Sequence, residues 1–177
     1  MSTFILVAGV GNIFFGDDAF GVEVVRRLSG RRLPQGVRVA DFGIRSYDLA
    51  YAFLDNYDLT ILVDATQRGG KPGTLYAIQP DFNILDAPAD RQIDAHGMNP
   101  LEVFRLVKAM GGQFRRVVVV GCEPGRLEAA EEGVMGLSEP VEAAVHEAVH
   151  MIEGMVGSFI EGRRESVLTA RVEGAQT

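Results

Sequence analysis

The sequence predicts a single-domain α/β protein, a three-layer α/β/α sandwich with a mostly parallel, twisted sheet. Short apolar runs that end in Gly or Asp are typical of strands buried on both faces of a parallel sheet. These runs alternate with segments of helical periodicity, which favours right-handed crossovers. A chain of 177 residues with 47% hydrophobic composition can bury one sizeable core. We expect one domain over residues 1–162 and a polar, flexible tail over 163–177.

The first strand and helix follow directly from the amino-terminal pattern. Residues 4–10 form a continuous apolar run that ends in glycine, which predicts a buried strand. Residues 18–28 have apolar side chains at helical spacing and charged ones on the other side, which predicts an amphipathic helix. The apolar stripe of this helix consists of Phe20, Val24, Val25 and Leu28.

Four more strands and three more helices are predicted along the chain. The strands cover residues 36–43, 58–65, 73–79 and 115–124, and the alternating segment 73–79 is expected at an edge or antiparallel. The helices cover residues 46–55, 99–112 and 138–162. The residues that mark the helix ends are Ser46, Asn99 and Ser138 as N-caps, Pro100 at a first helical position and Gly111 as a stop.

One long segment has no periodicity. Residues 80–97 are rich in Pro and Asp and are predicted to form a loop. A loop of this length in a compact domain is more often functional than idle.

Charge and cysteine content narrow the class of function. The net charge of −7 would repel nucleic acids and anionic membranes, so we expect neither as a partner. The amino-terminal apolar run is too short for a membrane span and has no basic segment before it, so we expect no membrane insertion and a cytoplasmic location. Cys122 is the only cysteine, which excludes an intrachain disulfide, and we expect it to fill the core.

The glycines after the first strand raise the possibility of a nucleotide loop. Gly9 and Gly11 fit the first two positions of the GxGxxG pattern, but Phe14 occupies the third. The carboxylates of Asp17 and Asp18 would also stand near the helix start, where phosphates should bind. We therefore expect no nucleotide cofactor, and a nucleotide-dependent oxidoreductase stays an unlikely alternative.

Carboxylates and an imidazole follow several predicted strands. One of Asp17 and Asp18 is expected to cap the first helix and the other to face a crevice at the carboxyl edge of the sheet. Asp64 ends a buried strand, where it must emerge at that edge or be buried at high cost. With His96 from the long loop, Asp18 and Asp64 would make an incomplete metal site with open positions. His146 and His150 share a helix face, which we interpret as a polar surface.

Several of these segments together resemble the hydrogenase maturation proteases. They are "GVGNIFFGDDAFG", "LVDA" followed by "GGKPGTLY", "DAHG" and "VVVVGCEP", and the resemblance spans about residues 4–160. It implies an endopeptidase that removes the carboxyl-terminal extension of a [NiFe] hydrogenase large-subunit precursor. It also implies metal contacts by Asp18, Asp64 and His96, with nickel supplied by the substrate. Several family members have Glu where this chain has Asp18.

The sequence is compatible with more than one chemistry of peptide-bond cleavage. A metal could polarise the scissile carbonyl or lower the pKa of water, or a carboxylate could activate water, as the family's classification among aspartic-type peptidases implies. Asp18 and Asp64 are the expected catalytic residues, and Asp41, at another strand end, is a lesser candidate. The main alternative is a noncatalytic chaperone that binds the nickel-loaded precursor.

Overall fold

A computed structural model describes residues 3–86, 99–127 and 135–174 of the chain, without the side chains of residues 84, 86 and 164–174. It confirms the predicted α/β fold. The strands are β1 (Ile5–Val10), β2 (Val37–Gly43), β3 (Leu59–Ala65), β4 (Leu75–Ile78) and β5 (Val117–Cys122). The α-helices are α1 (Phe20–Ser29), α2 (Ser46–Phe53), α3 (Pro100–Ala109) and α4 (Glu139–Gly174). Two short 3-10 helices are η1 (Gly16–Ala19) and η2 (Phe82–Asp86).

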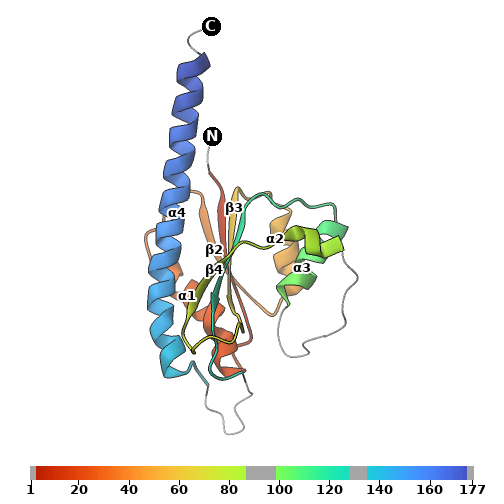
Figure 1. Cartoon of the computed structure of the whole chain (residues 1–177), viewed down its shortest axis with the longest axis vertical. Coiled ribbons are helices and arrows are strands. Elements are labelled where there is room, and N and C mark those ends of the chain that lie inside the picture. Colours follow the sequence, from red (N-terminus) through yellow and green to blue (C-terminus); the bar gives the residue numbers. More distant parts are fainter. Residues whose placement is uncertain (1–2, 87–98, 128–134, 175–177) are drawn as a thin grey trace.

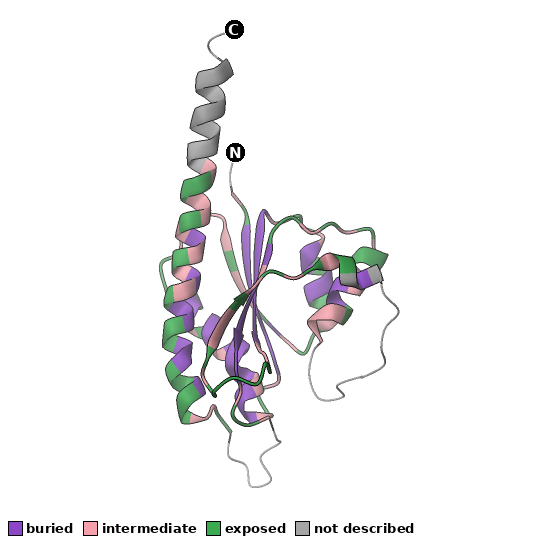
Figure 2. Cartoon of the chain, viewed as in Figure 1, coloured by how far each residue is buried: buried purple, intermediate pink, exposed green. Residues whose placement is uncertain are grey.

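The five strands form one sheet between two helical layers (Figure 1). Their order is β2-β1-β3-β5-β4, with all pairs parallel except β4 against β5. β4 is therefore an antiparallel edge strand, as the alternating sequence predicts. Helices α1 and α4 cover one face of the sheet, and α2 and α3 cover the other. Figure 2 shows that the central strands are buried, in line with their continuous apolar sequences.

Two glycines let α1 lie unusually close to the sheet. A Cβ atom on Gly21 would come within 2.1 Å of the Val63 carbonyl oxygen and 2.4 Å of the Val10 carbonyl oxygen. A Cβ atom on Gly9 would come within 2.3 Å of the Gly21 carbonyl oxygen. Close contact between α1 and β1 thus requires glycine at both positions. This packing accounts for part of the glycine-rich opening sequence.

Helix ends agree in part with the sequence predictions. Asn99 caps α3 as predicted, because its side chain accepts a hydrogen bond from the Leu101 N–H at 2.9 Å. Gly111 adopts a φ of +77° directly after that helix, which suits its role as a stop. The cap predicted for Ser46 is wrong, since Ser46 is the first helical residue of α2 and no side chain caps that helix.

Helix α4 is 36 residues long and extends past the sheet (Figure 1). It includes residues 163–174, where the sequence predicts the start of a flexible tail; residues 175–177 lie outside the described part. Its last turns contain good helix formers such as Arg, Glu, Leu and Ala and no proline, so the helix can continue. Within the described residues, no helix is both long and apolar enough to span a membrane.

Candidate active site

A cleft of about 840 Å³ opens between the sheet and α3 and reaches the carboxyl edge of the parallel strands. We call it the acidic cleft because it contains Asp18 and Asp64. Its other walls come from the segments that follow β3 and β4 and from the start of α3. They include Phe15, Ala65, Thr66, Gln67, Arg68, Ile78, Gln79, Pro80, Asp81, Asn99, Pro100, Leu101, Phe104, Val119 and Leu127.

Asp64 is the buried carboxyl group of this cleft. It is the second-to-last residue of β3 and pairs in register with Gly121 of the neighbouring strand β5. Only 8% of the residue is exposed. Burial, and then the negative charge of Asp18, raise the pKa of Asp64 well above its ordinary value, against a smaller lowering effect from the Ala65 backbone. Asp64 therefore holds a proton over a wider pH range than an exposed aspartate.

Asp18 reaches the cleft from η1, the short helix between β1 and α1. Its Oδ2 accepts a hydrogen bond from the Asn12 N–H at 2.5 Å, which ties the carboxylate to the turn after β1. Gly11 makes this turn possible with a φ of +131°, and a Cβ atom there would lie 1.8 Å from the Asp18 carbonyl oxygen. The second glycine of the opening motif therefore serves the placement of Asp18.

Asp17 has a different role from the helix cap considered for it. Its side chain is fully buried and caps neither η1 nor α1. Its carboxylate accepts hydrogen bonds from the N–H groups of Gly125 (2.8 Å), Arg126 (2.7 Å) and Ser138 (2.6 Å), and from the Ser138 hydroxyl (2.8 Å). These hydrogen bonds of Asp17 connect η1, the short helix that also carries Asp18, to the segment after β5 and to the start of α4.

Glu123 is a structural carboxylate that the sequence analysis missed. It is buried at the end of β5 and accepts hydrogen bonds from the backbone N–H groups of Arg68 and Gly69 and from the Tyr76 hydroxyl, at 2.8, 3.1 and 2.8 Å. Burial opposes ionisation, but these donors outweigh it and lower the pKa of Glu123. The signal was available, because Glu123 follows a buried apolar strand as Asp64 ends one. Glu123 fixes the turn that presents Arg68 to the acidic cleft.

The other predicted site residues do not join Asp18 and Asp64 in the described structure. His96 lies outside the described residues, although the described chain resumes at Asn99, in the cleft wall. Asp41 is exposed and does not line the cleft; its Oδ1 accepts a hydrogen bond from the Gly43 N–H at 2.8 Å. His146 and His150 are exposed on α4, with their Nε2 atoms 3.1 Å apart.

Among the side chains that the structure describes, no group of three or more His, Cys, Asp or Glu residues could hold a metal ion. Asp18 and Asp64 provide carboxylate oxygens at the carboxyl edge of the sheet, and a third carboxylate, Asp81, lines the cleft farther along, after β4. Two donors leave most coordination positions of an ion to other ligands.

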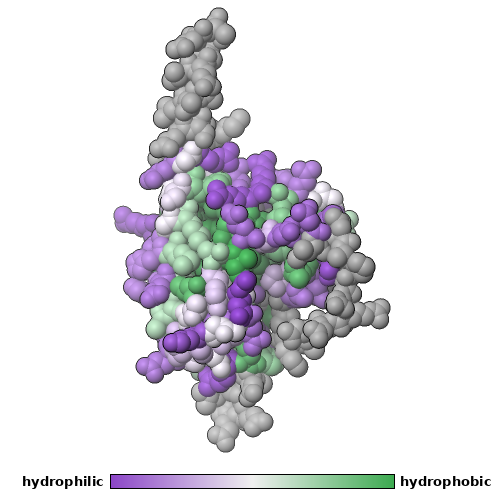
Figure 3. All heavy atoms as spheres, in the orientation of Figure 1, coloured by the Kyte–Doolittle hydropathy of each residue, from purple (hydrophilic) through white to green (hydrophobic). Residues whose placement is uncertain are grey.

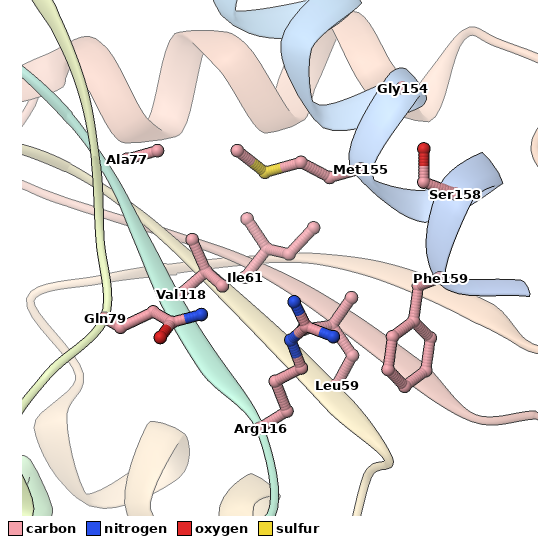
Figure 4. A pocket seen from close by; sticks show the side chains of 10 residues that line it. All are labelled: Leu59, Ile61, Ala77, Gln79, Arg116, Val118, Gly154, Met155, Ser158 and Phe159. Carbon is pink, nitrogen blue, oxygen red and sulfur yellow. The ribbon is translucent and has the colours of Figure 1, made fainter. Parts of the chain in front are cut away.

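A second cavity lies on the opposite face of the sheet and differs in chemistry. This groove of about 540 Å³ separates α4 from β3, β4 and β5, and Figure 4 shows Met155 and Phe159 of α4 on one side and Ile61 and Val118 on the other. The space-filling view, in the orientation of Figure 1, shows hydrophobic residues gathered in the middle of the visible surface (Figure 3). Arg116 is the only charged residue among the described lining residues, so the groove lacks the carboxylates expected of the active site.

Comparison with known proteins identifies the family of this chain. A family model described as hydrogenase maturation protease matches residues 22–155. The chain belongs to the hydrogenase maturation protease family. It is 30% identical to the hydrogenase 2 maturation protease of Escherichia coli over 152 residues, which cover 84% of this chain and 87% of that protein.

Solved structures of the family share the fold. The crystal structure of a hydrogenase 2 maturation peptidase from Thaumarchaeota archaeon SCGC_AB-539-E09 has 34% identity and a TM-score of 0.66, with 88% of this chain and 99% of that chain covered. The solution structure of an endopeptidase from Escherichia coli has 29% identity and a TM-score of 0.70, with 85% and 90% covered. Membership of this peptidase family supports a hydrolase activity, and the acidic cleft is the candidate site for it.

Proposed function

We propose that this hydrogenase maturation protease removes the carboxyl-terminal extension of a [NiFe] hydrogenase large-subunit precursor after nickel insertion. Asp18, Asp64 and His96 contact the nickel that the precursor carries. The observation that carries the proposal is that Asp18 and Asp64, from two different segments, line one cleft and influence each other electrostatically. Membership of the hydrogenase maturation protease family supplies the substrate class.

An incomplete donor set suits recognition of a metal that another protein holds. Carboxylate and imidazole groups are ligands for divalent ions such as Ni²⁺. Because the precursor provides the remaining ligands, this chain needs to add only a few. His96 precedes Asn99 by three residues in the sequence, and Asn99 lines the acidic cleft.

Asp18 and Asp64 also have the chemistry for hydrolysis of the aspartic type. A carboxylate whose pKa is raised is a stronger base than an exposed one, and burial raises the pKa of Asp64. We assign proton transfer to this pair. One carboxylate removes a proton from water as the water oxygen attacks the scissile carbonyl carbon, and the proton then passes to the leaving amine.

The test is cleavage of the nickel-loaded precursor by wild type and by site variants, followed by intact mass spectrometry. Wild type shortens the precursor by one carboxyl-terminal peptide. Asp18→Asn lowers the rate at least about 100-fold because the amide keeps the size but loses the charge and basicity. Asp18→Glu retains more activity because it restores a carboxylate. His146→Ala, on exposed α4, is the control and leaves the rate unchanged.

Two results would contradict the proposal. If wild type binds the nickel-loaded precursor but its mass stays unchanged, the protein is a chaperone. If Asp18→Asn folds and cleaves at the wild-type rate, the acidic cleft is not the active site.

A further inference from the structure

Exposed apolar side chains are concentrated around one end of the molecule. Among the residues that the structure describes, seven large hydrophobic side chains are exposed, and five of them lie on loops or helix starts at the carboxyl edge of the sheet. We call these five the apolar rim. They are Ile13 (42% exposed), Phe14 (62%), Ile44 (60%), Tyr47 (69%) and Met135 (62%).

The rim residues come from three chain segments that meet at η1. Ile13 and Phe14 lie directly before Phe15, which lines the acidic cleft. Ile44 and Tyr47 follow β2, whose Gly43 carbonyl accepts a hydrogen bond from the Gly11 N–H at 3.0 Å. Met135 precedes Gly136, whose carbonyl accepts a hydrogen bond from Arg126, and Arg126 in turn binds Asp17. These bonds join the segments of the rim to the turn and the short helix that carry Asp18, which lines the acidic cleft.

We infer that the apolar rim is the docking surface for the body of the large-subunit precursor. This inference rests on the proposed function. A protein substrate must bring its scissile bond into the acidic cleft, so its surface has to cover the surrounding edge. Single exposed hydrophobic residues are ordinary, but a cluster at the mouth of a cleft marks an interaction surface. Aromatic residues such as Phe14 and Tyr47 give the most contact area at such surfaces.

The chain offers a matched control residue at the opposite edge of the sheet. Phe4 is 53% exposed and lies directly before β1. It has the same residue type as Phe14, which is 62% exposed. The rim variant Phe14→Ser and the control variant Phe4→Ser therefore remove the same side chain.

The experiment measures KM and kcat for nickel-loaded precursor with the full chain. We expect the rim variant to raise KM at least about tenfold and to leave kcat within about twofold, because only binding is weakened. The control variant keeps both constants. Equal KM values for the rim and control variants would overturn the inference, as would a fall in kcat with unchanged KM.

Self-association is the competing use of an apolar surface. Analytical ultracentrifugation of wild type and the rim variant at assay concentration separates the two uses. A wild-type dimer that the rim variant abolishes would assign the surface to a second copy and overturn the inference; the same oligomeric state in both supports it. Failure of the wild-type protein to cleave the precursor would contradict the proposed function. This result differs from the one that would contradict the docking surface, in which wild type cleaves the precursor and the rim variant has an unchanged KM.

Discussion

Asp18 and Asp64 line the same cleft, and the charge of Asp18 adds to burial in raising the pKa of Asp64. Their segments are held together by the β3–β5 pairing and by Asp17, which joins η1 to the residues after β5. Two carboxyl groups that would repel each other are thus fixed in one place by the fold. Such an arrangement favours a shared proton or a bound cation over two free charges.

The raised pKa of Asp64 makes stability depend on pH. Below the ordinary value of 3.8, Asp64 is protonated in both folded and unfolded chains. As pH rises, the unfolded chain releases this proton before the folded protein does, so the contribution of Asp64 to stability falls until pH passes its raised pKa. Asp64→Asn is neutral throughout. We expect its melting temperature to exceed that of wild type at neutral pH and the difference to shrink toward pH 4.

Thermal melts of wild type and Asp64→Asn between pH 4 and pH 9 measure this effect. Asp18→Asn provides an internal control, because loss of the Asp18 charge removes one cause of the raised pKa of Asp64. In the Asp18→Asn background, the stabilisation by Asp64→Asn should therefore extend over a narrower pH range. A melting difference that does not vary with pH would show that Asp64 titrates like an exposed carboxylate.

Asp17 is predicted to support activity through the position of Asp18. Asp17→Asn keeps one acceptor oxygen but places an amide N–H₂ against one of the donors, so a buried group loses its partner at a cost of about 1 to 3 kcal/mol. Displacement of η1 should also slow cleavage by at least about tenfold, since small misplacements of catalytic groups are costly. Denaturant unfolding and kcat of the folded fraction are the two measurements.

Asp58 is the matched control for Asp17. It is also a buried carboxylate, but it lies at the opposite edge of the sheet, where it accepts hydrogen bonds from the Phe4 N–H, Arg115 and Arg163. Asp58→Asn should cost similar stability and leave kcat of the folded protein unchanged. Equal losses of kcat in the two variants would mean that Asp17 acts only through global stability.

The sequence was sufficient to predict the fold because its signals are local. The run that forms β3 needs no partner to be recognised, and Asn99 with Pro100 marks the start of α3 by its own chemistry. Asp17 and Asp18 could not be told apart in this way. They are adjacent and chemically identical, and what separates them is Ser138, 121 residues away, which donates two hydrogen bonds to Asp17. Long-range donors decide such roles.

Cys122 is predicted to have a structural role. It is fully buried between the sheet and α4, and burial, followed by the charge of Asp17, raises the pKa of its thiol to about 12. The thiol therefore stays protonated at neutral pH and is not a nucleophile. Cys122→Ser should cost about 1 to 3 kcal/mol and retain cleavage. A folded Cys122→Ser protein that cannot cleave the precursor would refute this role.

Substitution by alanine should have opposite effects at a tightly packed glycine and at a glycine with open space around it. Gly21→Ala should destabilise the protein by about 3 kcal/mol or more, because its methyl group would meet the Val63 and Val10 carbonyl oxygens. Gly154→Ala, in α4, meets nothing within 4 Å and should stabilise the helix by about 0.5 to 1 kcal/mol. Urea unfolding compares the two variants with wild type, and a harmless Gly21→Ala would mean that α1 does not need this close approach.

The most direct test of the account compares one precursor with and without nickel. Purified protein is incubated with the cognate large-subunit precursor in both states, and intact mass spectrometry follows the loss of the carboxyl-terminal peptide. We predict loss of one peptide from the nickel-loaded precursor and an unchanged mass for the nickel-free one, because the nickel-free form lacks the ion that we propose Asp18, Asp64 and His96 contact. Equal cleavage of both forms would contradict the metal-recognition role of these three residues.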